Sequence, residues 1–471
     1  MTKIKCLKDG KIESAKITQL ARFSEDFQYI IDSDGNKVKF NDSRIVHIDP
    51  APRNPYGKHL VIDLYKKFNR NIRISNETDK NTLQYAKTIC SGRECLPNVA
   101  IAGAVLKDIH EYRDKNEITL YRDPLNQFGP CQNGAWPVLW DSFAKRLNLK
   151  NVIFCVSPKS SNNFLGLSQE LLVWEIINYI IGHYLIEARN ALQCIAEGKD
   201  KALRIFEEKT NIFINAVKEG KKTLRTGLIN WAREIAKIPK KAKMTEKPKV
   251  LIFGGLNLLF IHYPVENFFL EKGIIVKVVD IRETINWLIS EKVTRFGFKR
   301  GKITPKDQFN INLQNLSTLD ENEILDAKKA KTSKQMMNFL NSQCNIFRKI
   351  ISKSGLLFDK EISYWKQIEE GHKYASNNGF TETSLIIGRF LHSAKSGIYD
   401  GLINLGTFNC QPAMNSQAII RHLANRYKIP YAAIDCEGPW ITTNQIRLLE
   451  TIAVQIKRIR EEKNKNRIDN I

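Results

Sequence analysis

The sequence predicts an α/β protein with two Rossmann-like parallel-sheet units, helical insertions and a small N-terminal β-rich module. Two observations lead to this prediction. Short apolar runs alternate with helical patterns in two separate parts of the chain, which is typical of α/β folds. In addition, the run Lys249–Phe253, a helix expected near Pro264–Lys272 and the run Ile274–Val279 have the spacing of a right-handed βαβ unit.

The first part of the chain divides into a β-rich module, residues 1–52, and a first α/β unit, residues 53–165. Short β-like runs in the module, the last of them Arg44–Ile48, are separated by turn formers that predict hairpins. In the α/β unit we expect strands at Ile118–Tyr121 and Asn151–Val156.

The remainder begins with a helical segment and linker at residues 166–245, where apolar residues recur with a 3.6-residue period. A second α/β unit with a helical insertion follows at residues 246–455. Its last strands are expected at Gly401–Leu405 and Tyr431–Ile434. Residues 456–471 are predicted to be a charged C-terminal tail.

Composition narrows the class of protein without identifying it. The chain has 471 residues, 42% hydrophobic and 26% charged, which supports packed domains and excludes wholesale disorder. Lys and Arg number 73 against 50 Asp and Glu, a net charge of +23 that suits a phosphate-bearing partner. Aromatic residues do not interleave with the basic runs as single-strand binders require, so the pattern argues against nucleic acid.

The sequence predicts a cytoplasmic protein without a membrane span. The N-terminus lacks the apolar region of a signal peptide, and no apolar run approaches the roughly 18 residues that a membrane helix needs. Nine cysteines without a secretion signal argue against a disulfide scaffold. Their thiols are therefore core residues, metal ligands or redox groups.

Three cysteines lie just ahead of expected helices in loops rich in Gly and Pro, namely Cys95, Cys131 and Cys410. A helix N-terminus presents unpaired N–H groups and positive dipole, which stabilise thiolates and the charge of an iron–sulfur cluster. Three thiolates that converge at the carboxyl ends of strands would leave one iron open to a substrate oxygen.

Two other interpretations of these cysteines stay open. Each could be an ordinary buried thiol in a turn. Cys90 and Cys95, with four residues between them, could also begin a zinc site, although no second tight Cys/His pair accompanies them.

The cysteine motifs and their order resemble a known family over roughly residues 85 to 455. The motifs are Glu94-Cys95-Leu96-Pro97, Gly129-Pro130-Cys131-Gln132 and Asn409-Cys410-Gln411-Pro412. Together they are similar to the 2-hydroxyacyl-CoA dehydratase and benzoyl-CoA reductase iron–sulfur family. The likeness is strongest to its activase-associated branch, which includes double-cubane cluster proteins.

This resemblance implies a redox subunit, an oxidoreductase or lyase component with a [4Fe–4S] or double-cubane iron–sulfur cluster. It implies Cys95, Cys131 and Cys410 as the iron ligands, with Cys90 as a fourth or bridging ligand. The implied partners are a separate ATP-hydrolysing activase that injects low-potential electrons, an acyl-CoA-type substrate, and a second copy or a homologous subunit in a dimer.

The chain departs from the family pattern in ways that leave the substrate open. Gln132 stands where Arg is usual, Gly255 stands where Glu is usual, and the activase ATPase is not in this chain. A non-catalytic scaffold or assembly subunit therefore remains the alternative. No catalytic residue is assigned, and Glu94 and Glu437 are interpreted as ordinary polar residues.

Overall fold

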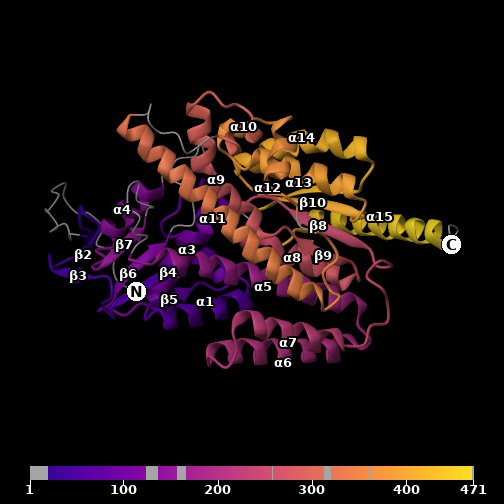
Figure 1. The fold of residues 1–471 in the computed structure, drawn as a ribbon, viewed down its shortest axis with the longest axis horizontal. Coiled ribbons are helices and arrows are strands. Elements are labelled where there is room, and N and C mark those ends of the chain that lie inside the picture. The colour runs from indigo at the N-terminus through magenta and orange to yellow at the C-terminus, as the bar shows by residue number, and fades with distance from the viewer. Residues whose placement is uncertain are drawn as a thin grey trace.

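The structure, a computed structural model, consists of two four-stranded parallel sheets surrounded by helices and a three-stranded antiparallel sheet near the N-terminus (Figure 1). It describes residues 20–122, 136–155, 166–256, 258–311, 320–360 and 362–468. The predicted fold class is confirmed.

The first α/β unit contains the sheet with strand order β5-β4-β6-β7. Parallel strands of this kind are covered on both faces by helices, and all five residues of β4 are buried. The elements of this unit are β4 (Ile45–Asp49), α1 (Pro55–Lys67), β5 (Asn71–Ile74), α2 (Lys80–Ala86), α3 (Leu96–Glu111), β6 (Ile118–Arg122), α4 (Trp136–Arg146) and β7 (Val152–Cys155).

The second α/β unit contains the sheet with strand order β11-β10-β8-β9, and a long helical insertion separates β9 from β10. Strands β8 and β10 are buried throughout. The elements are β8 (Lys249–Phe253), α8 (Leu258–Glu271), β9 (Ile275–Val278), α9 (Ile281–Lys299), α10 (Pro305–Phe309), α11 (Glu321–Ser352), α12 (Tyr364–His372), the 3₁₀ turn η2 (Asn377–Gly379), α13 (Thr383–Ser396), β10 (Gly401–Thr407), α14 (Gln411–Tyr427), β11 (Tyr431–Cys436) and α15 (Thr443–Ile468).

The two sheets have the same topology. Numbered within its own unit, each has the strand order 2-1-3-4, because β4, β5, β6 and β7 correspond to β8, β9, β10 and β11. The sequence shows no internal repeat, so this equivalence lies in the connections. In such sheets the order reverses between strands 1 and 3, and ligands bind beyond the carboxyl ends at that point.

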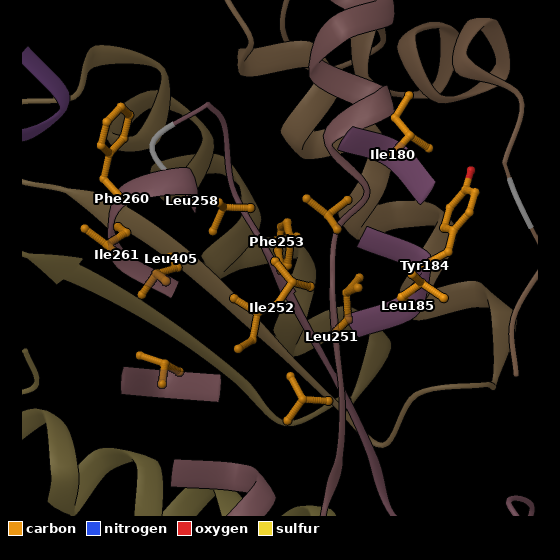
Figure 2. Packing of buried hydrophobic residues seen from close by; sticks show 14 of the residues in the cluster. Ile180, Tyr184, Leu185, Leu251, Ile252, Phe253, Leu258, Phe260, Ile261 and Leu405 are labelled. Carbon is orange, nitrogen blue, oxygen red and sulfur yellow. The ribbon is translucent and has the colours of Figure 1, made fainter. Parts of the chain in front are cut away.

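Three helices connect the units: α5 (Gln169–Ile195), α6 (Lys199–Lys218) and α7 (Leu224–Ala236). Helix α5 packs against the second sheet, and its Leu185 is drawn near Leu251 of β8 in the shared core (Figure 2). One continuous apolar core therefore extends through both units. Helix α5 is long and apolar enough to cross a membrane, but 72% of its most apolar window is buried, as in the core helix of a soluble protein.

Within the described residues, which begin at residue 20, the N-terminal sheet has three strands. It contains β1 (Arg22–Phe23), β2 (Tyr29–Ile31) and β3 (Lys37–Lys39). The run Arg44–Ile48, expected in this module, forms β4 and pairs in parallel with β5 and β6. All five residues of β4 are buried, which suits a central parallel strand and not a hairpin, so the first α/β unit begins before residue 52.

Two helices begin earlier than expected, and both differences affect the site. Helix α8 begins at Leu258 and contains Pro264, which we expected at its start. The buried Phe260 and Ile261 explain the extension, because they add apolar contacts to the core. Helix α14 begins at Gln411, directly after Cys410, and helix α15 continues through the predicted tail to Ile468.

Candidate functional site

The carboxyl ends of both sheets open onto one pocket, which we call the interdomain cleft. Its walls come from the loop after β4 at Pro52–Asn54, the loop after β8 at Gly255–Leu256, and the end of β9 at Val278–Asp280. Helix α5 contributes His183 and Asn190. The enclosed cavity is about 50 Å³, which is room for one or two water molecules.

Cys95 lies at the N-cap of α3, at the end of the loop that connects α2 to α3. Its thiol is buried and does not cap the helix. The second helical residue is Pro97, whose missing N–H is one that a helix start leaves unpaired in any case. The Cys95 side chain therefore lies at the positive end of the helix dipole and makes no capping hydrogen bond to the helix.

The loop that leads to Cys95 is organised by Glu94. One carboxylate oxygen accepts hydrogen bonds from the Ser91 N–H and hydroxyl, both at 3.0 Å. The other accepts from the N–H groups of Gly92 and Arg93 at 2.9 and 3.1 Å. Burial alone would raise the pKa of Glu94, but these donors outweigh burial and lower it. A residue interpreted from sequence as ordinary thus fixes the shape of the loop.

Cys410 repeats the arrangement of Cys95 in the second unit. It is the N-cap of α14, its side chain makes no capping bond, and Pro412 is the second helical residue. It follows β10 directly, so it lies beyond the carboxyl end of the strand at which the order of the second sheet reverses. The preceding residue, Asn409, has φ of +61°, a strained backbone conformation that Asn tolerates better than most residues.

The two cysteine loops touch each other. The Asn409 side-chain Nδ2 donates a hydrogen bond to the Arg93 carbonyl oxygen at 3.4 Å, although the two residues are 316 positions apart. Cys95 is two residues from Arg93, and Cys410 adjoins Asn409. Two of the three predicted ligands thus lie in loops that belong to separate α/β units and touch each other.

Cys131, the third predicted ligand, lies outside the described residues together with its whole Gly129–Gln132 motif. Its position in the chain is still informative. It lies between β6 and α4, as Cys410 lies between β10 and α14. Because β6 and β10 are equivalent strands, Cys131 and Cys410 belong to topologically equivalent connections.

Two buried polar groups near the cysteines have no hydrogen-bond partner among the described residues. They are the Asn98 amide Nδ2, in the first turn of α3, and the Thr407 hydroxyl, at the end of β10. Each side chain is 1% exposed. Amide and hydroxyl donors suit the sulfur atoms of a cluster, so these residues and the thiol donors fit an iron–sulfur group.

The described residues do not by themselves complete a metal site. Within them, no group of three or more His, Cys, Asp or Glu is arranged to hold a metal ion, which leaves zinc at Cys90 and Cys95 without further ligands. Cys90 is half-buried. Burial, and then the Glu94 carboxylate, raise the pKa of the Cys90 thiol to about 12, so it is protonated at neutral pH.

The other described cysteines are buried thiols, namely Cys194, Cys344 and Cys436. Burial is the largest cause that raises the pKa of each to about 12, so each is protonated at neutral pH. These surroundings are those of inert core thiols.

Three acid–base residues near the cleft were missed by sequence reasoning. His262 and Glu266, on α8, line the cleft, and Glu382 accepts the Leu256 N–H at 3.1 Å just behind it. The spacing of His262 and Glu266 on one helix face could have identified that pair. Nothing in the sequence connects Glu382 with residue 256.

No protein-family model matches the chain, and no curated protein matches it significantly. The geometry of the site and the motif resemblance therefore carry the functional conclusion.

Proposed function

We propose that the chain is a cytoplasmic iron–sulfur redox subunit that accepts low-potential electrons from a separate ATP-hydrolysing activase for a difficult reduction. One observation supports this most directly. The Cys95 and Cys410 loops, each with a Cys-x-Pro helix start, come from separate units and are joined by the Asn409–Arg93 hydrogen bond.

In this proposal Cys95, Cys131 and Cys410 hold the cluster, with Cys90 as a fourth or bridging ligand. When bound, the cluster supplies one-electron transfer at an iron with an open position. Asn98 and Thr407, whose buried donors have no partner among the described residues, would supply hydrogen bonds to its sulfur atoms. Glu94 holds the Cys95 loop in shape before the metal arrives, which reduces the ordering needed on binding.

The surface charge fits the proposed partners. The segment 199–243, which contains the α6–α7 hairpin, has thirteen Lys and Arg against five Asp and Glu. Most of these basic residues are exposed, among them Lys199, Arg204 and Arg225. Such a surface attracts an acidic activase or the phosphates of an acyl-CoA substrate. In this proposal a homologous subunit would bind at a different surface of the chain.

A second function, a non-catalytic scaffold or relay subunit, is favoured by the size of the cleft. Pockets for drug-sized ligands typically measure about 300–1,000 Å³. The cavity of about 50 Å³ admits no such molecule unless the units move apart. A subunit that only holds or passes electrons needs no larger space.

The test of the redox proposal is the metal content of the anaerobically purified chain. We expect iron and sulfide, with an electron paramagnetic resonance signal that Cys95→Ala, Cys131→Ala or Cys410→Ala abolishes or changes. Cys194→Ala is the matched control, because that thiol is buried in α5. An iron-free chain, or a signal indifferent to all three ligand substitutions, would contradict the proposal.

A second experiment separates catalyst from scaffold. The reduced chain is prepared with an activase and ATP, and acyl-CoA compounds are added. Substrate-dependent reoxidation supports the catalytic function. Stable reduction in the presence of every substrate, together with co-purification of a homologous subunit that has a full motif set, supports the scaffold.

A further inference from the structure

Two acid–base side chains on α8 form a close pair in the interdomain cleft. The His262 Nδ1 lies 2.6 Å from the Leu258 carbonyl oxygen, and the His262 Nε2 lies 3.5 Å from the Glu266 Oε2. The other carboxylate oxygen of Glu266 accepts a hydrogen bond from the Asn190 Nδ2 at 2.5 Å. Both side chains are largely buried, at 13% and 5% exposure.

This geometry determines where a proton is needed. A carbonyl oxygen only accepts, so the His262 Nδ1 must carry the hydrogen that it donates to Leu258. In a neutral ring the Nε2 is then a bare acceptor, and it faces a carboxylate oxygen, another acceptor. Two acceptors repel in a buried setting, and one additional proton between them turns the repulsion into a charge-assisted hydrogen bond.

We propose that His262 and Glu266 share one proton and form the proton-donating group of the interdomain cleft. The shared proton follows from the geometry alone. Its use in turnover rests on the proposed redox function, in which an oxygen leaves a reduced substrate and must be protonated.

The surroundings favour release of this proton. The titratable and polar groups around the pair are His183, Glu187 and Asn190 on α5, Arg53 after β4, Asp280 after β9, and Tyr263 on α8, whose hydroxyl is hydrogen-bonded to Glu77. Burial, the largest effect, lowers the pKa of His262, with His183 acting in the same direction. The Glu266 charge and the bond to Leu258 oppose this lowering only in part. A histidine with a lowered pKa is a stronger acid than a free one.

The step is a single proton transfer. The N–H bond at the His262 Nε2 breaks, an O–H bond forms on the departing oxygen, and the pair is left as a neutral ring beside a carboxylate. A proton from solvent water restores the pair. Glu77, which is exposed and accepts a hydrogen bond from the Tyr263 hydroxyl, lies on the solvent side of this group.

Histidine-selective ¹⁵N magnetic resonance on the full chain tests the shared proton without any turnover. The His262 signal is assigned with His262→Asn. Because burial lowers the pKa of His262 from its ordinary value of 6.5, in the wild type we expect the Nε2 to become protonated or strongly hydrogen-bonded only as the pH falls below 6.5. In Glu266→Gln we expect the ring to lose its proton at a pH at least one unit lower, a tenfold loss of proton affinity.

The control and the contradicting results are defined on the same helix. Glu271→Gln removes an exposed carboxylate at the end of α8 and leaves the His262 signal unchanged. A Nε2 that stays bare in the wild type at every acidic pH at which the chain remains folded overturns the proposal even if Glu266→Gln fails to fold. Identical His262 titrations in the wild type and Glu266→Gln overturn it as well.

Turnover gives the second readout. If the chain is catalytic, His262→Asn and Glu266→Gln lower kcat by about 10²–10⁴-fold, the usual effect of losing a general acid, with iron content unchanged. Unchanged kcat in both variants contradicts the role in turnover. An iron-free chain contradicts the redox function and leaves the magnetic resonance result standing.

Discussion

At the scale of single residues, Glu382 is a buried acid whose surroundings are unfavourable for a charge. It is 7% exposed, and among the described residues its carboxylate accepts the Leu256 N–H, at 3.1 and 3.3 Å from the two oxygens. Burial raises its pKa to about 7, and the Leu256 bond offsets this effect only in part. A buried carboxyl with no basic partner destabilises the fold when charged, which is typical of functional sites.

Glu382→Gln tests this effect through the pH dependence of stability. The folded pKa lies above the ordinary value of 4.5, so this group's contribution is fully present below pH 4.5 and is lost as the pH rises towards 7. We expect about 3 kcal/mol of wild-type unfolding free energy to disappear over this range, relative to Glu382→Gln. Urea denaturation at a series of pH values measures the difference.

Glu437→Gln is the control for Glu382, because Glu437 is exposed. Its stability should follow the wild type at every pH. If the unfolding free energies of Glu382→Gln and the wild type change with pH in parallel, Glu382 is not held neutral by burial.

At the scale of secondary-structure elements, the position of Cys95 depends on how closely α2 and α3 pack. Gly103 of α3 lies against the backbone of Thr82 in α2, where an added Cβ would overlap the Thr82 carbonyl oxygen. The loop that contains Cys90 and Cys95 connects these two helices. A change in their separation therefore moves the candidate ligands.

Gly103→Ala is expected to lower the unfolding free energy by about 1–3 kcal/mol, because the new methyl group forces the helices apart. Iron bound per chain should fall along with stability. Thermal unfolding and iron analysis measure the two effects. Gly379→Ala is the control, since no atom lies within 4 Å of its added Cβ. Equal stability of the two variants would show that α2 and α3 adjust freely.

Most elements that face a core on both sides could be predicted from sequence, and β8 matches its prediction, Lys249–Phe253. Strand β5, Asn71–Ile74, was missed because it is short, two of its four residues are polar, and it lies partly exposed at the sheet edge. The Cys410 loop was identified from its Gly/Pro context. The contact of this loop with Arg93 could not be predicted, because local sequence patterns carry no information on how the two units pack together.

At the scale of the whole molecule, a buried ionic network fastens the bridging helix α5 to the second unit. Asp359 lies 2.5 Å from the Lys277 Nζ and 2.6 Å from an Arg348 guanidinium nitrogen. Arg348 also pairs with Glu187 of α5 at 2.9 Å. These residues come from α5, β9, α11 and the segment after α11, so the network connects the bridging helix to the second unit.

Asp359→Asn should destabilise the protein by about 3–5 kcal/mol at pH 7, because it leaves buried cations with too little negative charge. Burial would raise the pKa of Asp359, but Lys277, Arg348 and Arg389 hold it well below the ordinary 3.8. Its contribution is therefore present above pH 3.8 and is lost as the pH falls below that value.

Urea denaturation from pH 3 to pH 7 checks this prediction. The unfolding free energy of the variant should fall less steeply than that of the wild type as the pH decreases. Asp326→Asn removes an exposed pair with Lys299 and should change stability by no more than about 1 kcal/mol. Equal effects of the two substitutions would contradict a special role for the buried network.

The contact between Arg93 and Asn409 also orders events during biosynthesis. The two residues are 316 positions apart, so at about 5–20 residues per second the ribosome adds the second cysteine loop roughly 15 to 60 s after the first. The first unit therefore has time to fold before the second cysteine loop is synthesised. If the proposed function holds, iron can be held by both loops only after the second unit has been made, so the order of synthesis delays assembly of the cluster.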